Sequence, residues 1–157
     1  MKNNYRIHVL AVIIAASLLQ ACNQAPDMNK VRADVAKAQA DGQKTVVDAQ
    51  AKLDKVMAEN NKDVVGAQAD AANSNNAQAA NSDVTKARSD AALKVADAQY
   101  DVDKAKAEAA YKVADANCEA QTGDAKKSCH DSAKQTYDSS VNAAKQKNDQ
   151  AHQANKT

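Results

Sequence analysis

The sequence is poor in the residues that usually build a large hydrophobic core. Its 157 residues include no Phe, no Trp, one Pro, three Gly and four Tyr. Fewer than one residue in five is Leu, Ile, Val or Phe, and side chains this sparse could scarcely enclose a ligand cavity. The chain also has no Gly-rich phosphate loop, GxSxG or HExxH motif. We therefore expect no enzyme, no cofactor and no small-molecule substrate.

An excess of charge of one sign is also missing. Twenty-one Lys and Arg residues stand against 20 Asp and Glu, which leaves a formal net charge of +1. General attraction to nucleic acid requires a surplus of basic residues. We therefore expect no nucleic-acid partner.

Proline is absent after Pro26, so the strongest helix breaker does not interrupt the 131 residues that follow. Residues 22–157 contain 33 Ala, the best helix former, against 12 Val and 2 Leu. Composition alone would permit disorder. The helix propensities instead predict an all-α protein built from long Ala-rich helices.

The first 21 residues have the layout of a secretory signal peptide. Lys2 and Arg6 precede an apolar run from Val9 to Leu19, and small residues follow that run. Eleven apolar residues are too few to span a bilayer, because a spanning helix takes about 20. We predict a cleaved leader over residues 1–21.

The end of this leader resembles the lipobox of bacterial lipoproteins, in which a dedicated peptidase cuts before a lipid-modified cysteine. The matching residues are Leu19, Gln20, Ala21 and Cys22. The resemblance implies that Cys22 is acylated, with palmitate among its lipids, and becomes the first residue of the mature chain. Residues 22–27 then form a tether, and three acyl chains anchor the protein without spanning the membrane.

The position after the cysteine bears on localisation. In Gram-negative lipoproteins an aspartate there tends to retain the protein at the inner membrane, whereas this chain has Asn23. The resemblance therefore implies a lipid-anchored protein of the cell envelope, on the periplasmic face of the outer membrane.

Between residues 83 and 122, small or branched residues recur in steps of three and four that average 3.6. They are Val84, Ala87, Ala91, Val95, Ala98, Val102, Ala105, Ala109, Val113, Ala116 and Ala120. This stripe predicts one continuous helix. Residues 91–99 return eighteen residues later as 109–117. Because eighteen residues make five turns, the repeat restores the same face.

A second apolar seam lies about 200° round the same helix. It consists of Leu93, Ala96, Tyr100, Ala107, Tyr111, Ala114 and Cys118. A helix with seams on two sides is expected to be contacted from both.

Residues 28–72 offer a partner for one of these seams. Their approximate stripe is Val46, Ala49, Leu53, Val56, Val64, Ala67 and Ala71, with Gly42 and Gly66 as weak points. The Asn/Ser-rich residues 73–82 predict the break before the next helix. Whether the helix over 28–72 packs on the seam or extends freely stays open.

Cys118 and Cys129 form an even pair once the first cysteine is assigned to lipid, and an exported chain meets conditions that permit disulfides. Between them, Gly123 suits the position just past a helix end and Asp124 suits the N-cap of the next helix. The near-symmetry of the cysteines about this turn predicts a disulfide-closed antiparallel hairpin. It occupies residues 83–157, with a returning helix over residues 124–152 and a short polar tail.

The neighbours of these cysteines give little support to other chemistry. A metal site normally needs four ligands, and only His130 is adjacent, about 100° from Cys129 on a helix. A nucleophilic cysteine paired with His130 would lack a third orienting group. We therefore expect no metal and no catalytic residue, and we interpret His152, in the polar tail, as solvated.

Aspartates recur every seven residues along much of the chain, and many have a lysine three or four residues later. Examples are Asp34 with Lys37, Asp90 with Lys94, and Asp131 with Lys134. Such pairs support helices. A ladder of divalent ions is the alternative interpretation, but the lysines neutralise the carboxylates locally, so we expect a solvated charged surface.

The leader, the lipobox and the Ala/Lys/Asp-rich helices together resemble small helical outer-membrane lipoproteins. The paired cysteines enclosing Gly123-Asp124-Ala125-Lys126 resemble uncharacterised proteobacterial envelope lipoproteins with a Cys-paired hairpin. The resemblance implies an envelope structural or interaction element, with a homo-oligomer or an envelope protein bound along the Ala/Val seams. Two alternatives are a stress protectant, similar to late-embryogenesis proteins, that orders on drying, and a soluble periplasmic chaperone-like binding module.

Overall fold

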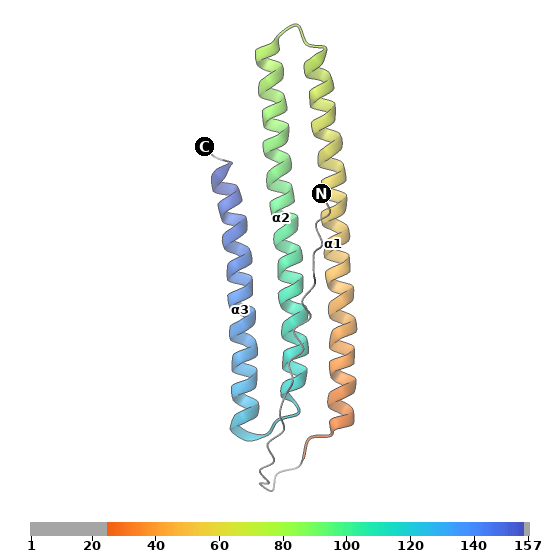
Figure 1. The fold of residues 1–157 in the computed structure, drawn as a ribbon, viewed down its shortest axis with the longest axis vertical. Coiled ribbons are helices and arrows are strands. Elements are labelled where there is room, and N and C mark those ends of the chain that lie inside the picture. The colour runs from red at the N-terminus through yellow and green to blue at the C-terminus, as the bar shows by residue number, and fades with distance from the viewer. Residues whose placement is uncertain (1–24, 156–157) are drawn as a thin grey trace, which may run out of the picture.

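A computed structural model describes residues 25–155 and shows three long α-helices joined by short turns (Figure 1). They are α1 (Met28–Ala72), α2 (Ala77–Cys118) and α3 (Gly123–Ala154). The all-α prediction is therefore confirmed. At 1.5 Å per residue, α1 is about 68 Å long.

The three helices lie side by side in a single antiparallel layer (Figure 1). The central helix α2 packs against both α1 and α3, whereas α1 and α3 do not pack against each other within the described residues. Pro26 and Val31 line the same surface hollow as Thr122 and Gly123. The N-terminal end of α1 and the α2–α3 turn therefore share one end of the layer.

Side-chain caps define where the first two helices begin. The Asp27 carboxylate accepts hydrogen bonds from the backbone amides of Asn29 and Lys30, at 2.9 and 3.2 Å. The Asn76 side chain accepts one from the amide of Ala79 at 3.2 Å. Each cap satisfies N–H groups that have no partner within their own helix.

The predicted break over residues 73–82 is too long. Helix α1 ends at Ala72 and α2 already begins at Ala77, because Asn76 caps it and the alanines that follow propagate it. Ala80, inside the predicted break, is buried. The Asn76 cap and the burial of Ala80 in α2 therefore outweigh the preference of Asn and Ser for loops.

Helix α1 does pack on the hairpin, and two contacts establish its register. A Cβ placed on Gly42 would lie 2.8 Å from the Ala109 Cβ, and the Asn60 side chain donates a hydrogen bond to the Ala91 carbonyl at 3.0 Å. Both contacts belong to the same antiparallel alignment. The same alignment places the small Ala98 opposite Leu53.

The predicted 3.6-residue stripes form this interface. Every residue of the stripes along 84–120 and 46–71 is buried or half-buried. The core is nevertheless thin. Its buried apolar residues within the described part are Val31, Leu53, Ala80, Val102, Ala105, Ala107, Cys118, Ala133 and Ala144. Interhelical contacts of small residues thus hold the layer together.

Gly42 and Asn60 are buried on the side of α1 that faces α2, although neither belongs to its apolar stripe. Gly42 is buried where α1 lies close against Ala109 of α2, so the expected weak point is a close-packing site. Asn60 is 5% exposed, and its amide is bonded to the α2 backbone. A buried polar residue of this kind can specify the register of two helices.

Along the described residues, no helix is both long and apolar enough to cross a bilayer.

Candidate functional site

Several predicted site residues lie outside the described part of the chain. The leader over 1–21, the lipobox residues Leu19, Gln20 and Ala21, and the acylated Cys22 all precede Ala25, where the described structure starts. The lipid site therefore stays a prediction.

The disulfide between Cys118 and Cys129 closes the α2–α3 hairpin, as predicted from the pairing of the cysteines. The two Cα atoms lie 5.5 Å apart, and Cys118 is fully buried. A separation of this size is ordinary for a disulfide. The linkage joins the last residue of α2 to the second turn of α3. It therefore connects these two helices covalently at the end of the layer where α1 begins.

The turn inside this disulfide differs in detail from the prediction. Helix α2 ends at Cys118, before residue 122, and the N-cap of α3 is Thr122 rather than Asp124. Gly123 begins α3 with a φ of +57°, a left-handed conformation that Gly adopts without steric cost. Asp124 falls in the first turn instead, where its charge suits the positive end of the helix dipole.

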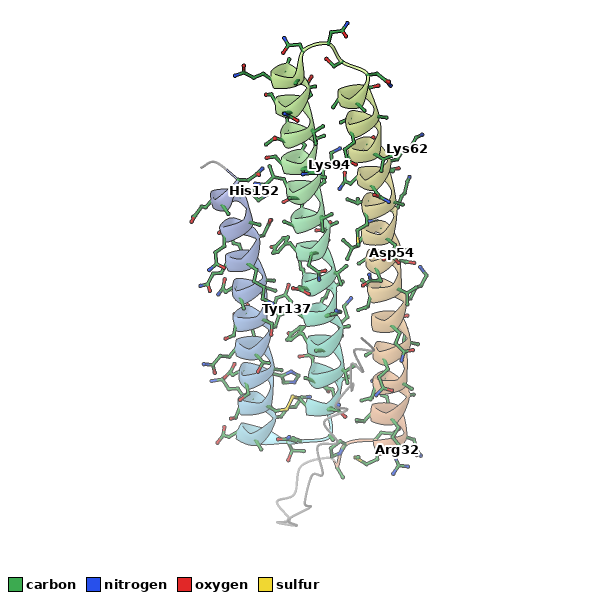
Figure 2. The ribbon with its side chains drawn as sticks, turned by 45° about the horizontal axis from the view of Figure 1, so that its top comes forward. Arg32, Asp54, Lys62, Lys94, Tyr137 and His152 are labelled. Carbon is green, nitrogen blue, oxygen red and sulfur yellow. A yellow bond between two sulfur atoms is a disulfide. The ribbon has the colours of Figure 1, made fainter. Side chains whose placement is uncertain are left out.

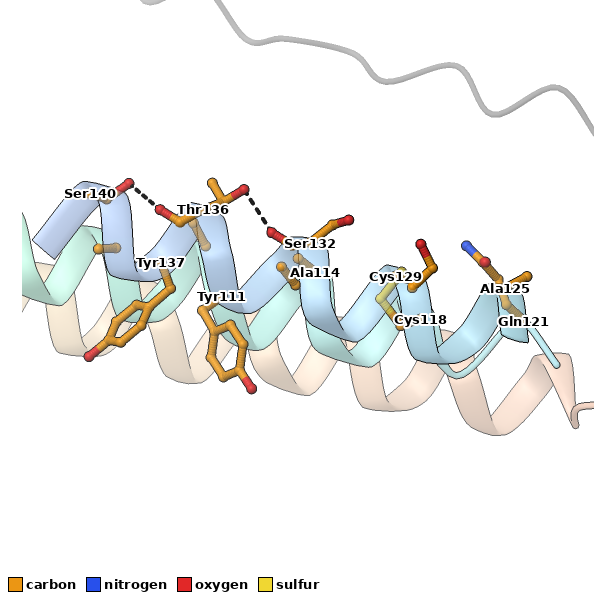
Figure 3. Close-up of a pocket in the computed structure, with 14 residues that line it drawn as sticks. Tyr111, Ala114, Cys118, Gln121, Ala125, Cys129, Ser132, Thr136, Tyr137 and Ser140 are labelled. Carbon is orange, nitrogen blue, oxygen red and sulfur yellow. Dashed lines mark hydrogen bonds between the residues drawn. A yellow bond between two sulfur atoms is a disulfide. The ribbon is translucent and has the colours of Figure 1, made fainter. Parts of the chain in front are cut away.

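Figure 3 shows the groove between α2 and α3 at this end of the layer. The disulfide, Tyr111 and Tyr137 line it, and the two tyrosine rings pack with centroids 5.4 Å apart. The hydroxyls of Thr136 and Ser140 donate to the carbonyls of Ser132 and Thr136 in their own helix, each at 2.9 Å. These two hydroxyls of the groove are therefore already bonded within α3.

Both histidines of α3 pair with aspartates of α2. His130 Nδ1 lies 2.6 Å from Asp115 Oδ1, and its Nε2 lies 3.3 Å from Glu119 Oε1. His152 Nε2 lies 2.7 Å from Asp97 Oδ1. The interpretation of His152 as merely solvated is therefore wrong, because α3 remains helical up to Ala154 and brings His152 alongside α2.

The 18-residue repeat of α2 explains this symmetry. Asp97 and Asp115 are equivalent positions of the two repeat copies, five turns apart on one side of the helix. Each receives one histidine from α3. The repeat was visible in the sequence, but the histidine partners were not, because the register of α3 on α2 is a tertiary property.

Hydrogen bonds lower the pKa of two carboxyl groups at this interface. The pKa of Asp97 lies below its ordinary value of 3.8 chiefly because His152 bonds to the carboxylate, and Asn148 contributes a second hydrogen bond at 3.0 Å. The pKa of Glu119 is lowered chiefly by the hydrogen bond from Lys126, at 2.7 Å. Both carboxylates therefore stay ionised at neutral pH and hold α3 electrostatically.

The exposed ion pairs within helices also differ from those expected. Lys134 pairs with Asp138 rather than Asp131, and Lys94 reaches across to Asp63 on α1. Further pairs with Lys four residues before Asp are Lys37–Asp41, Lys44–Asp48, Lys86–Asp90 and Lys145–Asp149. In all five of these Lys–Asp pairs the lysine comes first, whereas the expected pairs had the aspartate first.

We predict that the Asp97–His152 pair stabilises the hairpin above the ordinary carboxyl pKa and ceases to do so in acid. Since the folded-state pKa of Asp97 is depressed, its contribution is complete above about pH 4 and is lost as pH falls through the folded pKa. The carboxylate is more than half exposed, so the contribution should stay below about 1 kcal/mol. Carboxyl NMR titration is expected to give Asp97 a pKa below 3.8.

The variant His152→Ala should raise the pKa of Asp97 toward 3.8. The pKa of Asp41, which Lys37 lowers on α1 far from α3, should stay unchanged and serves as the control. An Asp97 titration that His152→Ala does not move would contradict the pairing.

Among the described residues, no group of three or more His, Cys, Asp or Glu side chains is arranged to hold a metal ion. Comparison of the chain with known protein families, curated proteins and solved structures gives no match.

Proposed function

We propose that the chain is a lipid-anchored, periplasm-facing helical element of the cell envelope with a structural or interaction role and no catalytic one. The leader pattern that ends at Cys22 carries this proposal. It resembles the processing site of lipoproteins, and it stands six residues before Met28, where α1 begins.

The geometry of the layer supports such a role. Six extended residues reach at most about 20 Å, so an acylated Cys22 would hold the N-terminal end of α1 close to the membrane. The disulfide-closed turn shares that end of the layer. The opposite end, at the turn over residues 73–76, would stand up to about 70 Å away in an upright orientation.

Covalent lipid on Cys22 is the decisive test. The full chain is expressed in a Gram-negative host with labelled palmitate, and we expect the label on the wild type, which should fractionate with the outer membrane. Cys22→Ala should lose both the label and the membrane association, because one cysteine provides the acceptor. The matched control, Cys118→Ala with Cys129→Ala, should remain labelled.

An unlabelled wild type recovered from the osmotic-shock fluid would refute the proposal and favour the soluble periplasmic binding module. A chain with little helix in dilute buffer, by circular dichroism, would favour the stress protectant that orders on drying. Because α2 packs against both α1 and α3 along long interfaces, we expect high helicity in buffer without drying.

A further inference from the structure

Helix α3 buries little apolar surface against α2. The buried residues of α3 are Ala133 and Ala144, whereas α1 buries the larger Val31 and Leu53. Polar side chains of α3 that pair with α2 are Lys126, His130, Lys147, Asn148, His152 and Asn155. The docking of α3 therefore depends strongly on the charges and hydrogen bonds across this contact.

Both ring nitrogens of His130 face carboxylates of α2. Nδ1 lies 2.6 Å from Asp115 Oδ1, and Nε2 lies 3.3 Å from Glu119 Oε1. A neutral imidazole has one N–H group and one lone pair, whereas imidazolium has two N–H groups. In either neutral form of this ring, a lone pair would point at a carboxylate oxygen. Only imidazolium can donate to both carboxylates.

The charges around this ring balance when it is protonated. Glu119 accepts a hydrogen bond from Lys126 at 2.7 Å through Oε2, its other carboxylate oxygen. With imidazolium, two cations of α3 meet two anions of α2. With neutral imidazole, one lysine faces both carboxylates. The pKa of Glu119 is lowered, chiefly by Lys126, so this carboxylate stays ionised throughout the pH range in which histidines change charge.

Other charged groups near the ring do not take the place of the imidazolium. Helix α1 does not pack on α3, but it contributes charged residues to the hollow that Glu119 and Lys126 line. These residues are Asp27, Lys30 and Asp34. Since two of the three are acidic, α1 adds no net positive charge there. On α3 itself, Lys134 follows one turn after His130 and is paired with Asp138 at 2.6 Å.

We propose that His130, Asp115 and Glu119 form a proton-binding site that makes the docking of α3 on α2 dependent on pH. Because the docked hairpin favours imidazolium, docking takes up a proton. Its contribution to stability is therefore present at the acidic end of the histidine range, about pH 5 to 8, and is lost as the pH rises through that range. The proposal goes beyond the proposed function and does not require lipid on the chain.

Opening of this contact has a structural consequence. Helix α3 covers the second apolar seam of α2, which includes Ala107 and Tyr111, and Tyr111 packs on Tyr137 of α3. Movement of α3 away from α2 would uncover this seam. The protonation of one ring thus controls access to an apolar surface of the central helix.

His152 is the internal comparison for His130. Its Nε2 lies 2.7 Å from Asp97 Oδ1. A neutral ring that keeps its proton on Nε2 can still donate this hydrogen bond. Loss of the charge on His152 therefore weakens its contact with α2 but does not turn a lone pair toward the carboxylate.

NMR of the ring nitrogens tests the proton-binding site. The full chain carries ¹⁵N-labelled histidine in mild detergent, and replacing each histidine in turn assigns the signals. We expect His130 to keep both ring protons to a higher pH than His152. Glu119→Gln retains an acceptor but removes the charge. Because all these side chains are partly exposed, the substitution should weaken the proton affinity of His130 by about two- to fivefold.

The matched control for this measurement is Asp97→Asn, which should weaken the proton affinity of His152 and leave that of His130 unchanged. The proposal is overturned by a His130 ring that loses its second proton at the same pH in the wild type and in Glu119→Gln.

Hydrogen exchange of the α3 amides, corrected for the intrinsic effect of pH, measures docking. We expect the open fraction of α3 in the wild type to rise about two- to fivefold between about pH 6 and about pH 8. His130→Gln should remove most of this rise, whereas His152→Gln should retain most of it. Circular dichroism verifies the fold of each variant. An open fraction that is constant over this range, or that rises equally in His130→Gln, would show that the ring does not control docking.

Discussion

Removal of the disulfide is expected to destabilise the hairpin by about 3 kcal/mol. Closing a loop of about a dozen residues restricts the unfolded chain by about this amount in the loop-entropy account. For a protein of this size the loss corresponds to a fall in Tm of about 10 °C. Thermal melts followed by circular dichroism should therefore show Cys118→Ala with Cys129→Ala melting well below the wild type, and reductant should lower the wild-type Tm by a similar amount.

The double variant provides its own control, because reductant should not shift its melting curve. Hydrogen exchange should locate the effect in α3, since α3 contacts α2 alone within the described residues, whereas α1 and α2 share a longer interface. Equal melting of oxidised and fully reduced wild type, with free thiols verified chemically, would show that the disulfide does not stabilise the fold.

Adding a single methyl group at Gly42 is expected to destabilise the layer by about 1–3 kcal/mol. A Cβ at this position would lie 2.8 Å from the Ala109 Cβ and 3.2 Å from its Cα. The second of these atoms belongs to the α2 backbone, which cannot yield without moving the helix. Urea unfolding of Gly42→Ala should therefore show a reduced free energy of unfolding, although alanine is the better helix former.

Gly66→Ala is the matched control. A Cβ there would meet no atom within 4 Å, so this substitution should stabilise the protein by about 0.5–1 kcal/mol through helix propensity alone. Combining Gly42→Ala with Ala109→Gly should relieve part of the clash, and the double-mutant cycle should give a favourable coupling energy above about 0.5 kcal/mol. A stabilising effect of Gly42→Ala, equal to that of Gly66→Ala, would refute the close approach of α1 and α2.

The Lys–Asp pairs along the helices were predicted in kind but not in their exact partners. Asp and Lys spacings correctly predict solvated intrahelical pairs, yet they do not decide whether Lys134 turns toward Asp131 or Asp138, because both carboxylates are within its reach along the helix. The structure selects Asp138. Likewise, His152 was expected to be solvated in a short polar tail, whereas it lies 2.7 Å from the Asp97 carboxylate, which also accepts a hydrogen bond from Asn148.

The surface predicted for a partner is covered by the chain itself. The Ala/Val seams of α2 were the expected surface for a homo-oligomer or another envelope protein. In the structure α1 and α3 cover these seams, so Val102 and Cys118 are fully buried. A partner that binds along these seams would have to displace α1 or α3 from α2.

The local features of this protein follow from its amino-acid pattern. Helix propensity and the 3.6-residue period specified three long helices, and the paired cysteines around Gly123 specified the closed hairpin. The packing of the helices decides that α1 docks on α2, that Gly42 and Asn60 establish its register, and that two histidines meet the repeated aspartates. Figure 2 shows His152 on α3, on the side of α2. The physical reason is that a periodic pattern identifies which residues share a face of a helix. The choice of the neighbour that covers the face depends on interactions between segments far apart in the chain.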